Sequence, residues 1–395
     1  MSESSNNPSS PLVGAIVVNY NSSNSWHIVS ECIEAVLRLT YRPLEIVIVD
    51  NGSDDDSLER INRLVNSSKP GDIKVRVARL PKNQGFAGGN NVGFGIVGEK
   101  AKYVALINSD LRPKPDSLGT LVSYLEENLD VAGVQGEILQ WNKPLIDSSG
   151  MYWTSFSTCL ARGLCMPSDS DRLSEVVDVT YADGAYSVYR TNALRSVEGM
   201  FDSRLFLHHE DAELGLRLWH AGHRVRSIPV VVGKHYRQLT SKSYDWAVFY
   251  YPYRNAVVLT VWYTRFWLPK LLLRVPHFVF VSLLERSSLV IRGLIDGFIT
   301  GIRCPCMTNR CQKSGVRAPV VSIRGLQLYA FMLGFFLRYG KRSRELQYMA
   351  LSQLATTLED GRLKLNLFKH ERRSIIPINR SIDRVFDEGS SLNGR

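Results

Sequence analysis

The chain has 395 residues, of which 44% are hydrophobic and 22% charged, and this composition is typical of a folded protein with two or three domains rather than of a disordered one. Its net charge of +10 is unevenly spread, because residues 236–395 contain 25 Lys and Arg against 10 Asp and Glu. We expect an anionic partner for this basic part. A membrane surface is favoured over nucleic acid, since no nucleic-acid-binding module is recognisable.

The N-terminal residues and the number of cysteines indicate in which cellular compartment the protein works. Residues 1–11 are polar and contain no apolar segment, so we expect a short disordered tail and no signal peptide. Six cysteines are few for this length and indicate a reducing, cytoplasmic environment. Cys304, Cys306 and Cys311 have part of the spacing of a metal site but no matching fourth ligand, so unpaired thiols in a loop are favoured.

Segments with two kinds of apolar pattern alternate along the first half of the chain. The strand-like segments are residues 15–20, 45–50, 73–80, 103–108 and 131–139, and the helix-like segments are residues 26–39, 57–65, 89–97 and 115–128. Short apolar strands that alternate with amphipathic helices indicate βαβ units. We therefore predict an α/β fold with a mainly parallel sheet flanked by helices.

Polar side chains stand where three of these strands end. Asn19, Asp50 and Asp110 occupy such positions, and ligands of open α/β sheets bind beyond the carboxyl ends of the strands. Capping of the following helix is the alternative for each residue taken alone. The glycines follow the third strand, at residues 83–95, so neither a dinucleotide-binding fingerprint nor a P-loop is present.

Residues 266–395 contain helix-like segments rich in aromatic and basic residues, and we expect them to form a region separate from residues 12–265. The apolar runs at residues 255–264, 275–284 and 325–337 are bounded by Arg or Lys, and none reaches the roughly 20 apolar residues that span a bilayer. Helices that lie in a membrane interface and a helical subdomain packed on the rest of the chain both fit this pattern.

Five motifs, in order, resemble those of the inverting family 2 glycosyltransferases, and most closely the rhamnosyltransferase-like branch. They are AIVVNYNS, EIVIVDNGSDD, NQGFAGGNNVGF, ALINSDLRP and FDSRLFLHHEDAELGLRLWHAGHRV, and the resemblance covers residues 12–265. It implies a GT-A fold that binds a nucleoside diphosphate sugar together with Mg²⁺ or Mn²⁺.

The resemblance also implies roles for individual residues. The implied donor-binding residues are Asn19, Tyr20, Asp50, Asn83, Gly85, Asn90, Asn108 and Asp183. Asp110 and His235 match metal ligands, and the pair Glu210–Asp211 matches the catalytic pair in which the Asp is the base. Asn108 departs from the usual acidic residue and brings no charge, so the donor diphosphate and His235 would have to complete the metal shell.

The residues themselves support part of this assignment. Inverting transfer needs one general base for the acceptor hydroxyl and stabilisation of the departing diphosphate. Asp211 is expected in the first turn of a helix, where the helix dipole favours the ionised carboxylate that a base requires. The alternatives are an ordinary acidic first turn for Glu210 and Asp211 and a structural role for His235.

These observations predict a cytoplasmic enzyme, peripheral at the inner face of the membrane, that acts in cell-surface polysaccharide synthesis. The resemblance alone implies a dTDP- or UDP-sugar donor, with L-rhamnose as the first candidate, and a saccharide or lipid-linked acceptor. A processive polysaccharide synthase is disfavoured because membrane spans and a Q-x-x-R-W motif are both missing from the sequence. A catalytically inactive nucleotide-sugar-binding partner in a polysaccharide-assembly complex remains the alternative.

Overall fold

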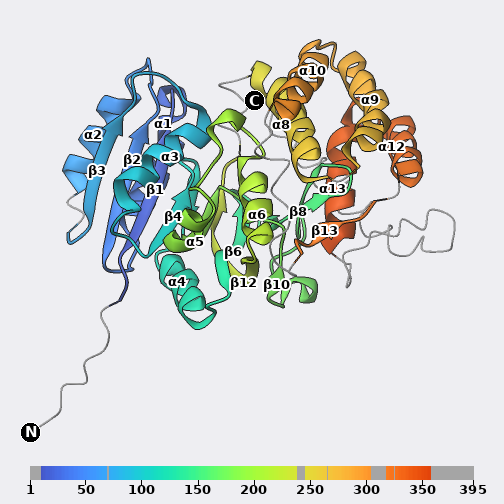
Figure 1. The fold of residues 1–395 in the computed structure, drawn as a ribbon. Coiled ribbons are helices and arrows are strands. Elements are labelled where there is room, and N and C mark those ends of the chain that lie inside the picture. Colours follow the sequence, from blue (N-terminus) through green and yellow to red (C-terminus); the bar gives the residue numbers. More distant parts are fainter. Residues whose placement is uncertain are drawn as a thin grey trace, which may run out of the picture.

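The computed structural model describes residues 10–68, 71–237, 245–264, 266–303, 317–323 and 325–356. The predicted tail lies outside the described residues apart from its last two positions, and so do the three cysteines at 304, 306 and 311. In these parts of the chain a central sheet carries helices on both faces, and a group of C-terminal helices lies beside it (Figure 1). The predicted α/β architecture with a C-terminal helical region is confirmed.

The large sheet is parallel where the sequence predicts it and mixed beyond. Its main path runs β10-β12-β6-β11-β4-β1-β2-β3, and β5 and β7 pair at its side with β12 and β6. The strands are β1 (Val13–Asn19), β2 (Leu44–Asp50), β3 (Lys74–Arg79), β4 (Tyr103–Ile107), β5 (Leu111–Pro113), β6 (Val131–Gln140), β7 (Ile146–Ser148), β10 (Val177–Asp178), β11 (Tyr186–Arg190) and β12 (Arg224–His235). β4, β1, β2 and β3 are parallel neighbours, whereas β11 enters antiparallel between β4 and β6.

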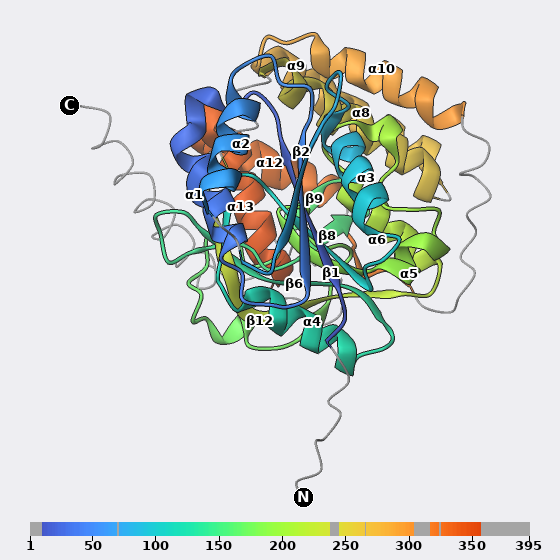
Figure 2. The same ribbon diagram turned by 90° about the vertical axis from the view of Figure 1, so that its left-hand side faces the viewer.

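Alternation along β1 and β2 explains why both faces of the sheet are covered. Val13, Ala15 and Val17 belong to a core cluster that includes α1 and α4, whereas Ile16 belongs to a second cluster that includes α3 and α6. The helices around the sheet are α1 (Trp26–Leu37), α2 (Ser57–Ser68), α3 (Gly85–Val97), α4 (Ser117–Glu127), α5 (Thr191–Ser196) and α6 (Glu210–His220). Successive strand residues point to opposite faces, so a fully apolar strand needs a helix layer on each side. Figure 2 shows the two layers from the side.

The C-terminal helices pack on one another and on the first half of the chain. They are α8 (Asp245–Tyr263), α9 (Trp267–Leu284), α10 (Leu289–Ile302), α12 (Gly325–Tyr339) and α13 (Ser343–Thr356). A small sheet, formed by β8 (Met151–Thr154), β9 (Cys159–Ala161) and β13 (Val320–Val321), joins the two halves. One core cluster contains Ala212 of α6, Leu259 of α8 and Leu346 of α13, so the helical region shares a core with the first half of the chain.

Three glycines in α10 allow it to approach α8 closely. A Cβ at Gly297 would lie 2.4 Å from the carbonyl oxygen of Arg254, and Cβ atoms at Gly293 and Gly301 would lie 2.8 and 2.9 Å from atoms of α8. Such distances exclude any larger residue without displacement of the helix backbone. The segment that the sequence indicates only as amphipathic is therefore a tight contact surface between two helices.

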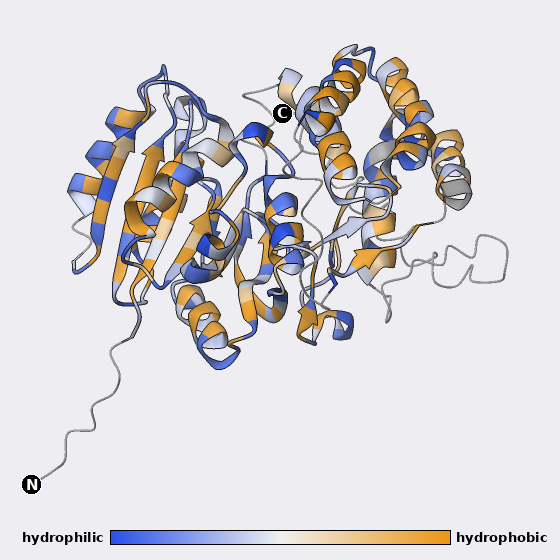
Figure 3. Ribbon diagram, in the orientation of Figure 1, coloured by the Kyte–Doolittle hydropathy of each residue, from blue (hydrophilic) through white to orange (hydrophobic). Residues whose placement is uncertain are grey.

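Helix α9 corrects the expectation that no segment is long enough to cross a membrane. By length and composition alone, its 18 residues with a mean hydropathy of 1.4 satisfy that requirement, and 22% of them are buried. Lys270 and Arg274 do not end the helix, and Pro276 is accommodated inside it. Figure 3 shows the apolar residues of α9 and α10 on their ribbons.

Candidate active site

Six of the predicted site residues line one cavity of about 390 Å³. These six residues are Asn108, Asp110, Asp183, Glu210, Asp211 and His235. They come from the ends of β4 and β12, the loop before β11 and the start of α6, and Tyr348 of α13 completes the wall. The antiparallel entry of β11 beside β4 brings the loop before β11 next to the carboxyl end of β4, because Tyr186 pairs with Ile107.

The three predicted residues at the ends of β1 and β2 do not line this cavity. Asn19 is buried and donates from its Nδ2 to Ser57 Oγ at 3.3 Å, while its Oδ1 has no partner among the described residues. Asp50 is also buried, and its Oδ2 accepts from the Ser53 N–H at 3.3 Å. Tyr20 directly follows β1 and is half-buried. Asn19 therefore links the end of β1 to the start of α2, and Asp50 closes a turn after β2.

The predicted residues of the glycine-rich segment form a framework next to the cavity. The Oδ1 of Asn83 accepts from Asn51 Nδ2 at 3.0 Å and from the Gly85 N–H at 2.8 Å. Asn90 is buried in α3 and donates to the Phe86 carbonyl oxygen at 2.9 Å. Gly85 has a φ of 73°, and a Cβ there would lie 2.2 Å from the Phe206 carbonyl oxygen. Glycine is thus required at position 85 by the loop that precedes α6.

His235 bridges two buried carboxylates. Its Nε2 lies 3.1 Å from Asp110 Oδ1 and its Nδ1 lies 3.0 Å from Asp147 Oδ2. Arg237 binds the other oxygen of Asp147 at 2.6 Å. Burial alone would lower the pKa of His235, but Asp110 and Asp147 raise it to about 10. The imidazole is therefore protonated in the ligand-free protein and donates to both carboxylates.

Asp110 and His235 fit a divalent cation. Two neighbouring ligands of an octahedral Mg²⁺, each about 2.1 Å from the ion, lie about 3 Å apart, which is close to the spacing of Asp110 Oδ1 and His235 Nε2. Asp147 holds the opposite nitrogen, as the carboxylate partner of a metal-binding histidine does. Among the described residues, no group of three or more His, Cys, Asp and Glu side chains is placed to hold a metal ion. Further ligands would have to come from a bound substrate.

The acidic groups at the start of α6 have raised pKa values. Burial, and then the charge of Asp183, raise the pKa of Asp211 to about 7. Burial, and then Asp211, raise the pKa of Glu210 well above its ordinary value. Asp211 accepts from the N–H groups of Ala212 at 2.8 Å and Gly184 at 3.3 Å. The N–H groups around the helix start lower the pKa of Asp211 as expected, but burial and the neighbouring carboxylate outweigh them, so the net pKa is raised.

The loop before α6 is strained and is held by one amide of α8. Phe206, His208 and His209 have positive φ values of 60°, 66° and 69°, a conformation that costs about 1–3 kcal/mol for each non-glycine residue. Asn255 Nδ2 lies 2.7–2.9 Å from the carbonyl oxygens of Leu205, Leu207 and His208. Asn255 is fully buried, so this contact excludes water. The backbone that aims Glu210 and Asp211 into the cavity depends on a side chain from the C-terminal half.

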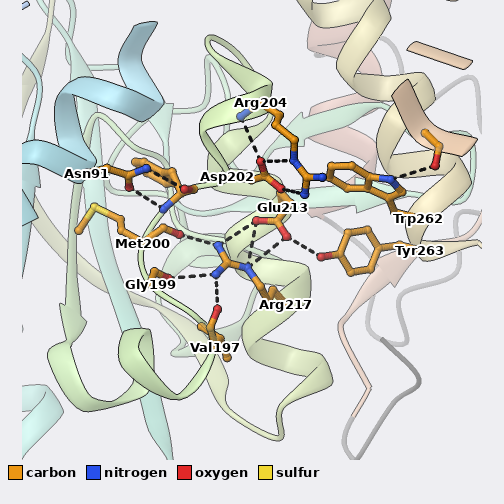
Figure 4. Close-up of polar contacts among 12 residues, drawn as sticks. Asn91, Val197, Gly199, Met200, Asp202, Arg204, Glu213, Arg217, Trp262 and Tyr263 are labelled. Atoms are coloured by element: carbon orange, nitrogen blue, oxygen red, sulfur yellow. Dashed lines mark hydrogen bonds and ion pairs between the residues drawn. The ribbon is translucent and has the colours of Figure 1, made fainter. Parts of the chain in front are cut away.

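A second hydrogen-bond network attaches residues 197–200 to α6 and α8 (Figure 4). Arg217 forms a buried ion pair with Glu213 at 2.9 Å and donates to the carbonyl oxygens of Val197, Gly199 and Met200. Tyr263 of α8 donates its hydroxyl to Glu213 at 2.6 Å. These groups lie outside the cavity lining and stabilise the helix that carries Asp211.

Sequence reasoning missed Asp147 and Asn255. Asp147 is separated from His235 by 88 residues and has no motif around it. Asn255 begins an apolar run, and a single amide at the head of such a run is the one local signal that points to a buried hydrogen-bonding role.

The chain is similar to known proteins in sequence and in fold. Residues 15–195 match the model of Glycosyl transferase family 2. The undecaprenyl-phosphate 4-deoxy-4-formamido-L-arabinose transferase of Yersinia enterocolitica is 31% identical over 121 residues, which are 31% of this chain and 36% of that protein. The glucosyl-dolichyl phosphate glucuronosyltransferase of Haloferax volcanii is 33% identical over 149 residues, which are 36% of this chain and 44% of that protein. The chain thus spans less than half the length of these relatives.

A crystal structure of GalNAc-T7 with UDP, GalNAc and Mn²⁺ has a similar fold. The TM-score is 0.52 at 15% identity, and the match covers 65% of this chain and 49% of that chain. The match over residues 15–195 indicates similarity to Glycosyl transferase family 2 in that segment, and the chain has the GT-A type of fold.

Proposed function

We propose that the chain is an inverting glycosyltransferase in which Asp211 is the general base. The observation that carries the proposal is the convergence of two groups in one cavity, the pair Asp110–His235 and the acidic group Asp183, Glu210 and Asp211. A base with a pKa of about 7 combines a large ionised fraction at neutral pH with a strong affinity for the proton it removes. Asp211 would take the acceptor hydroxyl proton as that oxygen attacks the anomeric carbon of the donor.

Asp110 and His235 would hold Mg²⁺ or Mn²⁺ at the donor diphosphate. When bound, such an ion stabilises the charge that develops on the departing nucleoside diphosphate. Asp147 fixes the orientation of His235 and, by accepting from Nδ1, leaves Nε2 free to coordinate. Asn108 lines the same cavity and offers an uncharged oxygen.

We infer a dTDP- or UDP-sugar donor, with L-rhamnose as the first candidate for the sugar, from the resemblance to the rhamnosyltransferase-like branch. We infer a saccharide acceptor that is linked to a lipid phosphate and used in cell-surface polysaccharide synthesis. The names of the two relatives, which contain undecaprenyl phosphate and dolichyl phosphate, support this acceptor class.

We propose that the C-terminal helices rest on the inner face of the membrane. Leu272 and Leu283 of α9 are 62% and 73% exposed, and Leu337 of α12 is 76% exposed. Arg286 and Arg303, at the ends of α9 and α10, are exposed as well. Apolar side chains flanked by cations suit an interface with anionic lipids.

Transfer of sugar from radiolabelled dTDP- and UDP-sugars to lipid-phosphate-linked saccharides, with Mn²⁺ present, tests the proposal. We expect Asp211→Asn to keep donor binding and to lower the rate of transfer by about 10²–10⁴-fold, the usual contribution of a positioned base. Near-normal transfer by this variant would remove Asp211 from the mechanism. Donor binding by the wild type without transfer or hydrolysis would instead favour an inactive nucleotide-sugar-binding partner.

A further inference from the structure

A second cavity adjoins the active site and belongs to the C-terminal half. It has a volume of about 120 Å³ and lies between the β8–β9 hairpin and helices α9, α12 and α13. Cys159 and Tyr348 line both cavities, so the two share a wall. We name it the Arg274 cavity, after the one basic side chain of the Lys and Arg type in its lining. At this volume it suits a single chemical group, because a whole drug-sized ligand needs about 300 Å³ or more.

Arg274 is a buried cation without a carboxylate partner among the described residues. The residue is 4% exposed, its Nη1 donates to the Ser157 carbonyl oxygen at 3.0 Å, and its guanidinium lies 4.8 Å from the ring centroid of Phe278. Burial lowers its pKa to about 10. A buried charge that lacks a counter-charge is costly, so an anion placed here would remove that cost and gain charge-assisted hydrogen bonds.

The rest of the lining is mainly apolar, and helices α9 and α12, which contribute to it, carry exposed apolar side chains elsewhere on their surface. Leu160, Leu328 and Met332 contribute apolar walls, and Tyr329 donates its hydroxyl to the Leu273 carbonyl oxygen. Leu273 itself is exposed. A guanidinium among apolar walls, next to an apolar surface, suits an anion attached to an apolar chain.

The position of Arg274 relative to the base fits an acceptor subsite. Cys159 and Tyr348 lie between the Arg274 cavity and the active-site cavity, because they line both. Burial, then the charge of His208, and then that of Arg274 lower the pKa of His209, the residue preceding Glu210, to about 3. His209 lines the active-site cavity. A ligand anchored at Arg274 could therefore present a hydroxyl across the shared wall towards Asp211.

We propose that the Arg274 cavity binds a phosphate group of the acceptor. This inference rests on the proposed transfer to a phosphate-linked saccharide and names the part of the acceptor that this chain recognises. The same chemistry could come from a phosphate on a lipid or from a free phosphate. The apolar walls favour the lipid-borne group.

Calorimetric titration of the full chain without sugar donor tests the site independently of catalysis. The probes are farnesyl phosphate, farnesol and inorganic phosphate, and the variants are Arg274→Met and, as a matched control, Arg63→Met on the exposed face of α2. We expect Arg274→Met to weaken farnesyl phosphate binding at least tenfold and Arg63→Met to leave it within twofold. Arg274→Lys should retain part of the affinity because it keeps the charge.

Two further outcomes identify the source of the phosphate and guard against a misfolded variant. Farnesyl phosphate bound much more tightly than inorganic phosphate assigns the site to a lipid-borne group, and equal affinities assign it to a free phosphate. Met332→Trp fills the cavity without changing Arg274 and should also abolish farnesyl phosphate binding. Equal binding of farnesol and farnesyl phosphate, or unchanged binding by both Arg274→Met and Met332→Trp, would overturn the proposal. UDP and dTDP binding by the same variants should stay unchanged, so failure of this site is distinguishable from failure of the proposed enzyme.

Discussion

Asn255 offers the sharpest test of how the two halves of the chain cooperate. Asn255→Leu keeps the approximate volume and removes the amide that holds the carbonyl oxygens of Leu205, Leu207 and His208. A buried polar group left without a partner costs about 1–3 kcal/mol. The amide has two hydrogens for three oxygens, so we expect a loss of about 2–4 kcal/mol in the free energy of unfolding.

The loss should extend to catalysis because the same loop carries positive φ values at Phe206, His208 and His209. Without the amide, the loop can relax towards unstrained backbone, and Asp211 would move with it. A displacement of about 1 Å at a reacting group can cost about 10²-fold in rate. We therefore expect kcat to fall about 10²-fold while KM for the donor changes little.

The matched control is Asn128→Leu. Asn128 Nδ2 donates to the Tyr124 carbonyl oxygen at 2.8 Å at the end of α4, away from the cavity lining. This variant should lose about 1 kcal/mol and keep its kcat. Urea unfolding and steady-state transfer rates measure both effects. The reasoning fails if Asn255→Leu is no less stable than Asn128→Leu and transfers sugar at the wild-type rate.

Three other predictions concern the base, the metal and the membrane. The rate of transfer should fall as the pH drops below about 7, because Asp211 must be ionised to act. Asp183→Asn should move this fall in rate to lower pH, because it removes a charge that raises the pKa of Asp211. An unchanged pH profile in Asp183→Asn would contradict the role of Asp183 in raising that pKa. Asp110→Ala should weaken donor binding in the presence of Mn²⁺ and have little effect on it in EDTA, as measured by titration calorimetry. If the wild type and Asp110→Ala bind the donor equally well with Mn²⁺, this result would argue against metal-mediated binding. The full chain should co-sediment with anionic liposomes at low salt and dissociate from them at high salt. The double variant Leu272→Glu, Leu283→Glu should bind the liposomes at least tenfold less. If this variant sediments like the wild type, this face of α9 is not the membrane contact.

The sequence is sufficient for the parts of the site that are encoded locally. Asp110 lies three residues after the apolar strand β4, and Asp211 lies in the first turn of an amphipathic helix. Such positions follow from the chain pattern alone, because parallel strands bring their carboxyl ends to one edge of the sheet. The chain pattern does not predict the antiparallel part of the sheet, because nothing in the segment Tyr186–Arg190 shows that it pairs antiparallel with β4.

Effects that depend on tertiary neighbours could not be predicted. The ionisation of Asp211 is an example, because the helix dipole is visible in the sequence whereas burial and the approach of Asp183 are not. Helix α9 is another example. Arg274 resembles an interruption of an apolar run when read along the chain, but it points into a cavity and the helix continues past it.

The contacts of α8 argue that the C-terminal helices and the candidate active site form one structural unit. On one side, α8 packs against the glycines of α10, where a Cβ at Gly297 would lie 2.4 Å from the Arg254 carbonyl oxygen. On another side, Asn255 holds the loop that leads to Asp211, and Tyr348 of α13 lines both cavities. Tight packing of this kind transmits a displacement instead of absorbing it. If the exposed face of α9 rests on a membrane, the height of Asp211 above that surface is therefore fixed by the fold. A phosphate held at Arg274 of α9 would in turn lie beside the active-site cavity, because the two cavities share Cys159 and Tyr348.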